Sequence, residues 1–411
     1  MSYIASRPAI LGGKPEFSEI MPFAQPTLPG ITEVFDEFYD IFTSKNITNG
    51  KYVRKFEEMA AHYLNVKHAV ALSSCTSGLM LVMRALGLKG EAIVPSFTFS
   101  ATVQALIWNG LKPVLADCDA RSFNIDANKV SGLINEKTSA IVGVHVFGMP
   151  CNAAALEKIA KENRLKLIFD AAHAFGSTYF GRHIGSFGEA EVFSLSPTKV
   201  LVAGEGGIVS TNNSDLADLI KIGRDYANPG DYNCRFPGLN ARMTEMNAVI
   251  AIKNLETIDS KVERRNELVS LYKHGLAGIP GISFQEEAPG FKSTYKDLSI
   301  VISPANFGLS RDDMALCLEM ENIKTKKYYS PPVHRQNVYM SLFPGECRDL
   351  AVTNFVSEHI LSLPIYTHMS EEDIKKVCFA VRKIFLYRKK IFSLLRGKDE
   401  GKLLPDLAGV I

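Results

Sequence analysis

The sequence is poor in the features that mark several common protein classes. Its 411 residues include one Trp and seven Cys, and no two cysteines form a C-x-x-C pair. The cysteines are odd in number and widely spaced, which argues against a disulfide framework and against a zinc site. Charge is nearly balanced, with 46 Lys and Arg against 44 Asp and Glu. No basic cluster lies beside aromatic residues, so we exclude a nucleic-acid partner.

Long apolar runs are also missing. No window approaches the ~18 consecutive apolar residues of a membrane span, and residues 1–13 lack the charged start and apolar run of a signal peptide. We therefore expect no membrane partner and a location in the reducing cytoplasm. A Rossmann dehydrogenase is excluded as well, because no G-x-G-x-x-G follows the first expected strand, where Ser74–Gly78 stands instead.

From Val66 onward, short apolar runs alternate with longer amphipathic stretches. Runs that are apolar on both faces predict the strands of a buried, mostly parallel sheet, at 69–72, 92–94, 113–116, 140–144, 165–169, 192–195 and 208–210. Apolar residues at three- and four-residue intervals predict crossover helices at 77–86, 98–108, 153–162 and 216–226. The pattern indicates an α/β fold with helices on both sides of the sheet.

The pattern changes after Gly238. A long helical stretch at 244–276 is followed by a smaller α+β region, with an expected strand at 299–302 and helices at 310–320 and from 370 to about 394. We therefore predict a large α/β domain with a mostly parallel mixed sheet, and a smaller C-terminal α+β domain. The expected divisions are an N-terminal arm at 1–30, the large domain at 31–240, the small domain at 241–396 and a tail at 397–411.

Ligands of open α/β sheets gather at the carboxyl ends of the strands, so the residues after each apolar run are candidates for a site. After 69–72 comes Ser73–Gly78, which offers hydroxyls and free backbone N–H groups at a helix N-terminus. Such a turn suits a phosphate, although an ordinary capped turn has the same composition. After 92–94 comes Phe99, which could stack on a planar ring or belong to the core.

Two further strand ends carry ionisable residues. Asp170 follows 165–169 among small residues, where a buried carboxylate needs a cation such as a protonated aromatic ring nitrogen. A helix N-cap is the alternative, and His173 nearby would ordinarily be a core histidine. Lys199 follows 192–195, between apolar residues and a glycine-rich turn. Burial would favour its neutral amine, the form that attacks a carbonyl, whereas a lone lysine is usually solvated.

Taken together, these segments resemble the pyridoxal-phosphate enzymes of the aspartate-aminotransferase fold, and specifically the DegT/DnrJ-type sugar aminotransferase family. The resemblance extends from about Asn46 to Tyr366. It is carried by DAAHAFG at 170–176, GRHIG at 181–185, FSLSPTKVLVAGEGG at 193–207 and PGLNARMTEMN at 237–247. Shorter matches support it, namely NGKYVRKFE at 49–57, PSFTFSA at 95–101 and YSPPVH at 329–334.

The resemblance implies pyridoxal 5′-phosphate as the cofactor and assigns a role to each matching residue. Lys199 would hold the cofactor as a Schiff base, Asp170 would pair with the pyridine nitrogen, Phe99 would stack on the ring and His173 would lie near its phenolic oxygen. The phosphate would be held by Thr76, Ser77 and Ser194, and by Asn240 from a second subunit of a homodimer with shared active sites. Cys75 and the turn Ser196-Pro197-Thr198 depart from the pattern of many relatives.

The same resemblance implies a reaction. L-Glutamate would supply the amino group and a nucleotide-linked keto-deoxysugar would accept it, with a 4-keto-6-deoxyhexose aminated at C4 as the expected case. Tyr329 and His334 are candidates for the sugar-nucleotide side of the pocket, or exposed loop residues. Relatives that dehydrate instead have a histidine in place of Lys199. The alternatives are amination at C3, a keto-inositol substrate, and a regulator or scaffold without turnover.

Overall fold

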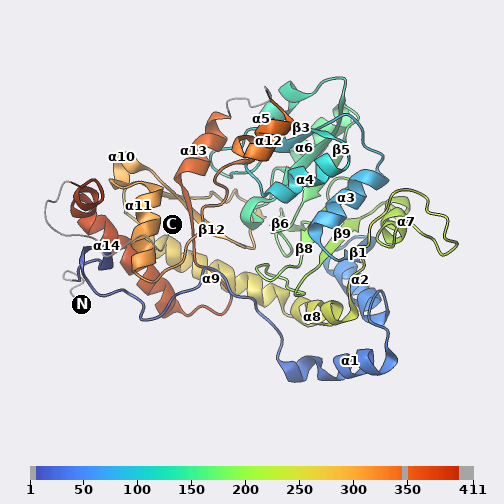
Figure 1. Ribbon diagram of the computed structural model, residues 1–411, viewed down its shortest axis with the longest axis horizontal. Helices are drawn as coiled ribbons and strands as arrows, with labels where there is room; N and C mark the ends of the chain where they lie inside the picture. Colours follow the sequence, from blue (N-terminus) through green and yellow to red (C-terminus); the bar gives the residue numbers. More distant parts are fainter. Residues whose placement is uncertain (1–5, 345–349, 398–411) are drawn as a thin grey trace.

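The computed structural model describes residues 6–344 and 350–397 and is built around a seven-stranded sheet (Figure 1). In spatial order the strands are β1 (His68–Leu72), β9 (Gly207–Thr211), β8 (Ala190–Ser194), β5 (Lys166–Asp170), β4 (Thr138–Val144), β2 (Glu91–Pro95) and β3 (Lys112–Ala116). β9 is antiparallel to both of its neighbours, and the other neighbouring pairs are parallel. The predicted strands and the mostly parallel mixed sheet are confirmed, and the carboxyl ends of six strands meet at one edge.

Helices cover both faces of this sheet, as the alternating pattern predicts. One face packs against α3 (Cys75–Ala85), α4 (Ser100–Trp108) and α7 (Ser214–Gly223), and the other against α2 (Lys51–Leu64), α6 (Ala153–Glu162) and α8 (Glu245–Leu255). The helix predicted to reach residue 226 ends at Gly223, because the Gly223 carbonyl accepts the N–H of Leu239 and the chain turns back. Short elements complete this part, namely α1 (Ile31–Ser44), α5 (Ala127–Val130), β6 (Thr178–Tyr179) and β7 (Arg182–His183).

The C-terminal part is a smaller α+β unit. Its three-stranded antiparallel sheet has the order β10 (Ile282–Phe284), β12 (Leu298–Ile302) and β13 (Ile360–Leu363). Around it lie α9 (Ile258–Leu276), α10 (Pro304–Phe307), α11 (Arg311–Met320), α13 (Ala351–His359) and α14 (Glu371–Leu395). α12 (Asn337–Leu342) packs instead on the large domain through Tyr339, and β11 (Phe291–Lys292) pairs with β6. Ser310 and Ser370 cap α11 and α14 in capping boxes, as their positions predict.

The expected helical stretch at 244–276 is two helices, because the backbone leaves the helical conformation between α8 and α9 at Thr257. α8 packs in the core of the large domain through Ala248 and Ile252. α9 continues from that core, with Val262, into the core of the small domain, with Leu268. Figure 1 shows α9 running between the two parts. The division at 240/241 stays a prediction, and the two hydrophobic clusters meet later, inside α9.

The N-terminal segment expected as an arm lies against the small domain. Ile10 and Phe17 pack in its hydrophobic cluster, and the N–H groups of Ala9 and Glu16 donate to the buried carboxylate of Glu321 at 2.9 and 2.8 Å. The expected tail lies outside the described residues, apart from Gly397. None of the helices in the described ranges has the length and apolarity that crossing a membrane requires.

Candidate active site

A cavity of about 310 Å³ opens at the edge where the carboxyl ends of the parallel strands meet. Residues at the ends of four strands line its wall. They are Ser74 to Thr76 after β1, Thr98 and Phe99 after β2, Asp170 at the end of β5 and Ser194 at the end of β8. The C-terminal half of the chain closes the other side with Lys296, Asp297, Tyr328 and Tyr329. The topology thus brings together strand ends that are far apart in the sequence.

Asp170 stands at the floor of the cavity as a buried carboxylate. Thr102 Oγ1 donates to its Oδ2 at 2.7 Å, and the N–H of Ala172 donates to its Oδ1 at 3.0 Å. Burial raises the pKa of this carboxyl, and the bond from Thr102, the bond from Ala172 and the charge of Lys199 oppose the rise. Both donors are neutral groups, so a cationic group in the cavity would find a carboxylate to pair with.

Lys199 lines the same cavity from the turn after β8. Its N–H donates to the carbonyl of Ser196 at 3.0 Å, and the residues that follow, Val200 to Ala203, are buried and anchor the turn in the core. Burial lowers the pKa of the Lys199 amine to about 8, and repulsion from Lys296 adds to the effect. About a tenth of the amine is then neutral at pH 7, against roughly 3 in 10,000 for an ordinary lysine.

The turn after β1 offers an anion site at the N-terminus of α3. Ser74 caps the helix, since its Oγ accepts the N–H of Ser77 at 3.1 Å. The hydroxyl of Ser77 donates to the Ser74 carbonyl at 2.8 Å, and Ser77 itself does not line the cavity, whereas Thr76 does. Gly207 lets β9 approach this turn, because a Cβ there would lie 2.4 Å from the Ser74 carbonyl carbon. Hydroxyls and helix N–H groups suit a phosphate.

The remaining predicted residues are placed as follows. His173 lines the cavity, and its Nδ1 accepts the N–H of Phe147 at 3.2 Å. Phe99 lines it too and is 59% exposed, with its ring 6.5 Å from that of Tyr329. Ser194 lines it from the end of β8, and Asn240 is an exposed residue away from it, where its Oδ1 accepts a bond from Arg242.

Of the two residues expected on the substrate side, the structure brings only Tyr329 to the cavity. His334 is 4% exposed and lies behind Ser96, whose Oγ is 2.7 Å from its Nδ1, while its Nε2 is 2.8 Å from Asn354 Oδ1. Neither expectation for His334, a pocket residue or an exposed loop residue, fits this position. The cause is the turn Val333–Arg335, which directs the imidazole into the protein.

Sequence reasoning missed two polar residues of this wall, and a third, Thr102, that contacts Asp170 from behind it. Lys296 and Asp297 form a buried ion pair, with Lys296 Nζ at 2.8 and 3.0 Å from the two carboxylate oxygens. A pair of charges directly before the apolar strand β12 is the signal that could have found them. Thr102 lies inside α4 and carries no signal in the sequence, because its contact with Asp170 depends on how the helix packs on the sheet.

A neutralisable lysine and a buried carboxylate facing one cavity, at the carboxyl edge of such a sheet, define an enzyme site. The model of the DegT/DnrJ/EryC1/StrS aminotransferase family matches residues 31–382. The chain belongs to this family, and the protein is a sugar aminotransferase.

Named relatives cover most of the chain. The dTDP-4-amino-4,6-dideoxy-D-glucose transaminase of Escherichia coli is 32% identical over 359 residues, which are 87% of this chain and 96% of that protein. A UDP-N-acetyl-3-dehydro-alpha-D-glucosamine 3-aminotransferase of Acidithiobacillus ferrooxidans is 30% identical, over 88% and 94%. The crystal structure of DesI in the presence of its TDP-sugar product has a TM-score of 0.89 and 34% identity, covering 95% of this chain and 99% of DesI.

Proposed function

We propose that the protein binds pyridoxal 5′-phosphate and transfers an amino group from L-glutamate to a nucleotide-linked keto-deoxysugar, at C4 of a 4-keto-6-deoxyhexose. The observation that carries the proposal is that Lys199 and Asp170 line one cavity, the first with a lowered pKa and the second buried. The names of the Escherichia coli relative and of the DesI complex favour a nucleotide sugar and C4. The name of the Acidithiobacillus relative keeps C3 as the alternative.

The residues of the cavity fit this cofactor. Lys199 has the amine for its aldehyde, Asp170 has the carboxylate for its pyridinium nitrogen, and the N-terminus of α3 with Thr76 suits its phosphate. Phe99 offers a ring at the mouth. When bound, the cofactor supplies an electron sink for a carbanion at the carbon that carries the amino group. The aldehyde, the pyridine nitrogen, the ring face and the phosphate of the cofactor would thus each meet a matching residue.

Lys199, Asp170 and the residues that contact them would each have a separate role in the reaction. With its amine free and neutral, Lys199 Nζ would be the base that takes the proton from the α-carbon of glutamate. Asp170 would keep the pyridine nitrogen protonated. The negative charge that forms at the α-carbon would then be stabilised by a positively charged ring. Thr102 and the N–H of Ala172 hold the Asp170 carboxylate in place. The cation of Lys296 faces Lys199 and favours the neutral amine.

An open groove next to the cavity suits the nucleotide end of the substrate. It shares Thr98, Phe99 and the tyrosines 328 and 329 with the cavity, and adds the exposed Lys326 and Lys327. Lys326 offers an ammonium group at the entrance, and Lys327 lies next to it in an ion pair with Asp312. Positive charge here matches a diphosphate, which carries negative charge between the sugar and the base. Tyr329 lies between the two spaces, and this position supports its proposed role on the sugar side.

The direct test is a half-reaction followed by a panel of acceptors. The protein is loaded with cofactor, treated with L-glutamate, and then given nucleotide sugars with a keto group at C4, at C3, or none, and a keto-inositol. We expect the absorbance of the aldehyde form to return with the 4-keto-6-deoxyhexose. Return with the 3-keto sugar or the inositol would support those alternatives instead, and no response to glutamate would favour a regulator or scaffold.

The pH dependence of cofactor attachment follows from the lowered pKa of Lys199. A lysine whose pKa falls to about 8 is charged below that pH and neutral above it. We expect the rate at which pyridoxal 5′-phosphate attaches to the stripped protein to rise about tenfold per pH unit up to pH ~8 and then to level off. Borohydride trapping followed by mass spectrometry of the Lys199 peptide measures it. A rate still rising steeply at pH 10 would show an unshifted amine.

We also propose the homodimer. The helix α1 extends from the body of the molecule (Figure 1) and has an apolar stripe that is 62–71% exposed, formed by Ile31, Phe35, Tyr39 and Phe42. A stripe of this kind favours association. A second copy fits it because Asn240 is exposed and does not line the candidate active-site cavity of its own chain. The cytoplasmic location stays a prediction.

We expect sedimentation to show a dimer for the native chain and a monomer with reduced cofactor affinity for Phe35→Glu. Leu386→Glu, which changes an equally exposed residue on α14, is the matched control and should leave the dimer intact. A stable, fully active native monomer would contradict the shared site.

A further inference from the structure

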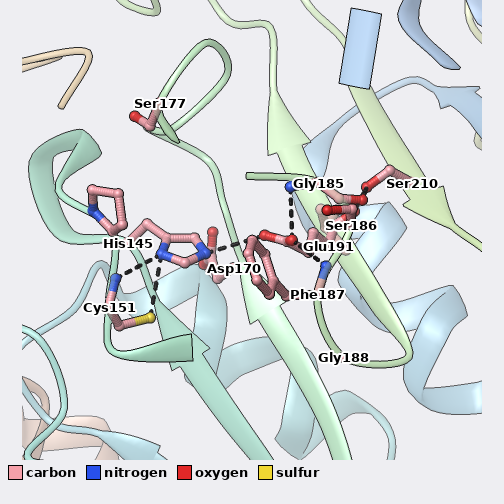
Figure 2. A network of polar contacts seen from close by, with 12 residues as sticks. His145, Cys151, Asp170, Ser177, Gly185, Ser186, Phe187, Gly188, Glu191 and Ser210 are labelled. Atoms are coloured by element: carbon pink, nitrogen blue, oxygen red, sulfur yellow. Dashed lines mark hydrogen bonds and ion pairs between the residues drawn. The ribbon is translucent and has the colours of Figure 1, made fainter. Parts of the chain in front are cut away.

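A buried polar network lies directly behind the candidate active site (Figure 2). It consists of His145, Cys151 and Glu191, whose exposed fractions are 0%, 1% and 0%. His145 follows β4 and also reaches the wall of the cavity, and its ring stacks on that of Phe169 with centroids 5.0 Å apart. Since Phe169 directly precedes Asp170 in β5, the ring of His145 packs against the residue next to the acid.

The hydrogen bonds of the imidazole determine which nitrogen carries the proton. His145 Nδ1 accepts the backbone N–H of Cys151 at 2.9 Å, and the thiol of Cys151 lies 3.2 Å from the same nitrogen. A nitrogen that accepts an N–H has a free lone pair, so the proton of His145 sits on Nε2. Nε2 in turn lies 3.1 Å from Glu191 Oε2 and donates to it. Burial opposes a charged ring, while the contacts with Cys151 and Glu191 raise the pKa of His145 to about 10. Nδ1 accepts the Cys151 N–H and so cannot carry a proton in this geometry, and the hydrogen bonds therefore assign a neutral Nε2–H imidazole.

Glu191 is bound on every side by donors. Its Oε1 accepts the N–H of Gly185 at 2.7 Å and that of Phe187 at 2.8 Å, and its Oε2 accepts from His145. A group that accepts three hydrogen bonds and donates none is an ionised carboxylate. Figure 2 shows the imidazole held between Cys151 on one side and Glu191 with its loop on the other. The ring has no freedom to flip.

The network reaches the cavity through the turn that His145 begins. The N–H of His145 donates to the Asp170 carbonyl at 3.1 Å, and the His145 carbonyl accepts the N–H of Gly148 at 3.1 Å. Gly148 has a φ of +94°, and a Cβ there would meet Thr294 Oγ1 at 2.0 Å, so the turn fits only one way. Within it, the N–H of Phe147 donates to His173 Nδ1. His173 therefore also carries its proton on Nε2.

We propose that Glu191 and His145 are positioning residues which, by holding the turn His145–Gly148, fix His173 as a neutral donor with its Nε2–H available to an oxygen in the cavity. Burial lowers the pKa of His173 well below its usual value, and the charges of Lys199 and Lys296 lower it further, so the ring stays neutral. The identity of the acceptor, the phenolic oxygen of the cofactor, rests on the proposed function. The assignment of the two histidine tautomers does not rest on the proposed function.

A catalytic role for Cys151 does not fit the same observations. Cysteine, histidine and a carboxylate in hydrogen-bond contact have the composition of a nucleophile with its base. The thiol is 1% exposed, however, and its contact is with the acceptor nitrogen of a buried ring, so no substrate can meet it. The position of Cys151 instead suits it to holding the imidazole ring of His145 in place.

Glu191→Gln provides a sharp test because it keeps the shape of the side chain and replaces one of its two acceptor oxygens by a donor NH2. If the amide oxygen faces Gly185 and Phe187, the amide NH2 faces His145 Nε2, which would then have to accept while Nδ1 accepts as well. A neutral imidazole has one acceptor nitrogen, so the two demands conflict. His145→Gln, in contrast, retains one donor and one acceptor. We expect Glu191→Gln to disturb His173, and His145→Gln to preserve it.

The first readout needs no cofactor. Long-range proton–nitrogen spectra of protein labelled with 15N-histidine report each tautomer, and the variants His145→Gln and His173→Gln assign the two signals among nine histidines. We expect both rings as neutral Nε2–H between pH 6 and 8, and a loss of that state at His173 in Glu191→Gln. A native His145 with Nδ1–H or two protons, or an unchanged His173 in Glu191→Gln, would overturn the proposal.

The second readout is the pH titration of the bound cofactor's absorbance. We expect Glu191→Gln to shift its midpoint by about one pH unit in the same direction as His173→Gln, the scale of one hydrogen bond. The control is Glu321→Gln, which breaks a buried pair with Lys383 (2.8 Å) in the small domain and should lower stability without moving either readout. Correct tautomers in a protein that fails to bind the cofactor would refute the proposed function and leave the positioning intact.

Discussion

Replacing Lys199 by Ala abolishes amino transfer and leaves the fold intact. The side chain supplies both the attachment point and the base, and the loss of a positioned base alone costs about 10²–10⁴-fold in rate. The turn that carries Lys199 is held by backbone bonds, namely Lys199 N–H to Ser196 and Ala203 N–H to Leu195, which alanine retains. The measurements are turnover with glutamate and a keto sugar nucleotide, the absorbance of the attached cofactor, and the melting temperature.

Lys261 gives a matched control for this experiment. It is another buried lysine whose pKa burial lowers to about 8, but it lies on α9, where its Nζ donates to Asn254 at 2.5 Å, away from the cavity. We expect Lys261→Met to alter stability and to keep both turnover and the cofactor band. If Lys199→Ala still transferred amino groups, the role assigned to Lys199 would be refuted.

Changing Asp170 to Asn should reduce the rate about 10²–10³-fold while the cofactor still binds. That range is the cost of removing one preorganised electrostatic partner of a transition state. The substitution keeps shape, and the amide oxygen can still accept the N–H of Ala172 while Thr102 adjusts its hydroxyl, so the fold should survive. Stopped-flow measurement of the glutamate half-reaction isolates the chemical step from binding.

Asp117 serves as the control for a carboxylate at a strand end outside the cavity. It follows β3 and accepts the N–H and the hydroxyl of Thr353 at 2.7 and 2.8 Å. Asp117→Asn should lower stability by about 1–3 kcal/mol and leave the half-reaction unchanged. Near-normal kinetics in Asp170→Asn, or an equal loss of rate in both variants, would remove the special role of Asp170.

Much of the large domain could be predicted because its signals are local. The strands are short apolar runs, and the strand-end positions of Asp170 and Lys199 follow from where those runs stop. The same logic could not find Thr102, whose contact with Asp170 depends on the packing of α4 on the sheet. It could not find Lys296 either, which reaches the cavity through the packing of the small domain against the large one.

Two other differences have the same physical origin. His334 stands in a loop-like stretch with prolines, and contacts between distant parts of the chain, such as those to Ser96 and Asn354, bury its ring. Glu191 lies inside an apolar strand, where the sequence favours a core residue, and its partners are main-chain N–H groups of a distant loop and a ring on another strand. Contacts between elements leave no periodic pattern in the sequence, so these positions could not be predicted from it.

The position of α9 determines where two homologous chains can be joined in a chimera. Because Ile258 and Val262 belong to one hydrophobic cluster and Leu268 and Tyr272 to the other, a chimera joined at residue 240 would graft a foreign α8 and α9 onto the native sheet. A crossover placed after Val262 would transplant Lys296, Tyr328 and the lysines of the groove together and keep α8 with its own sheet, provided that the N-terminal segment, which packs on the small domain, is exchanged with it. Exchange of acceptor preference between homologues is therefore best attempted at that joint.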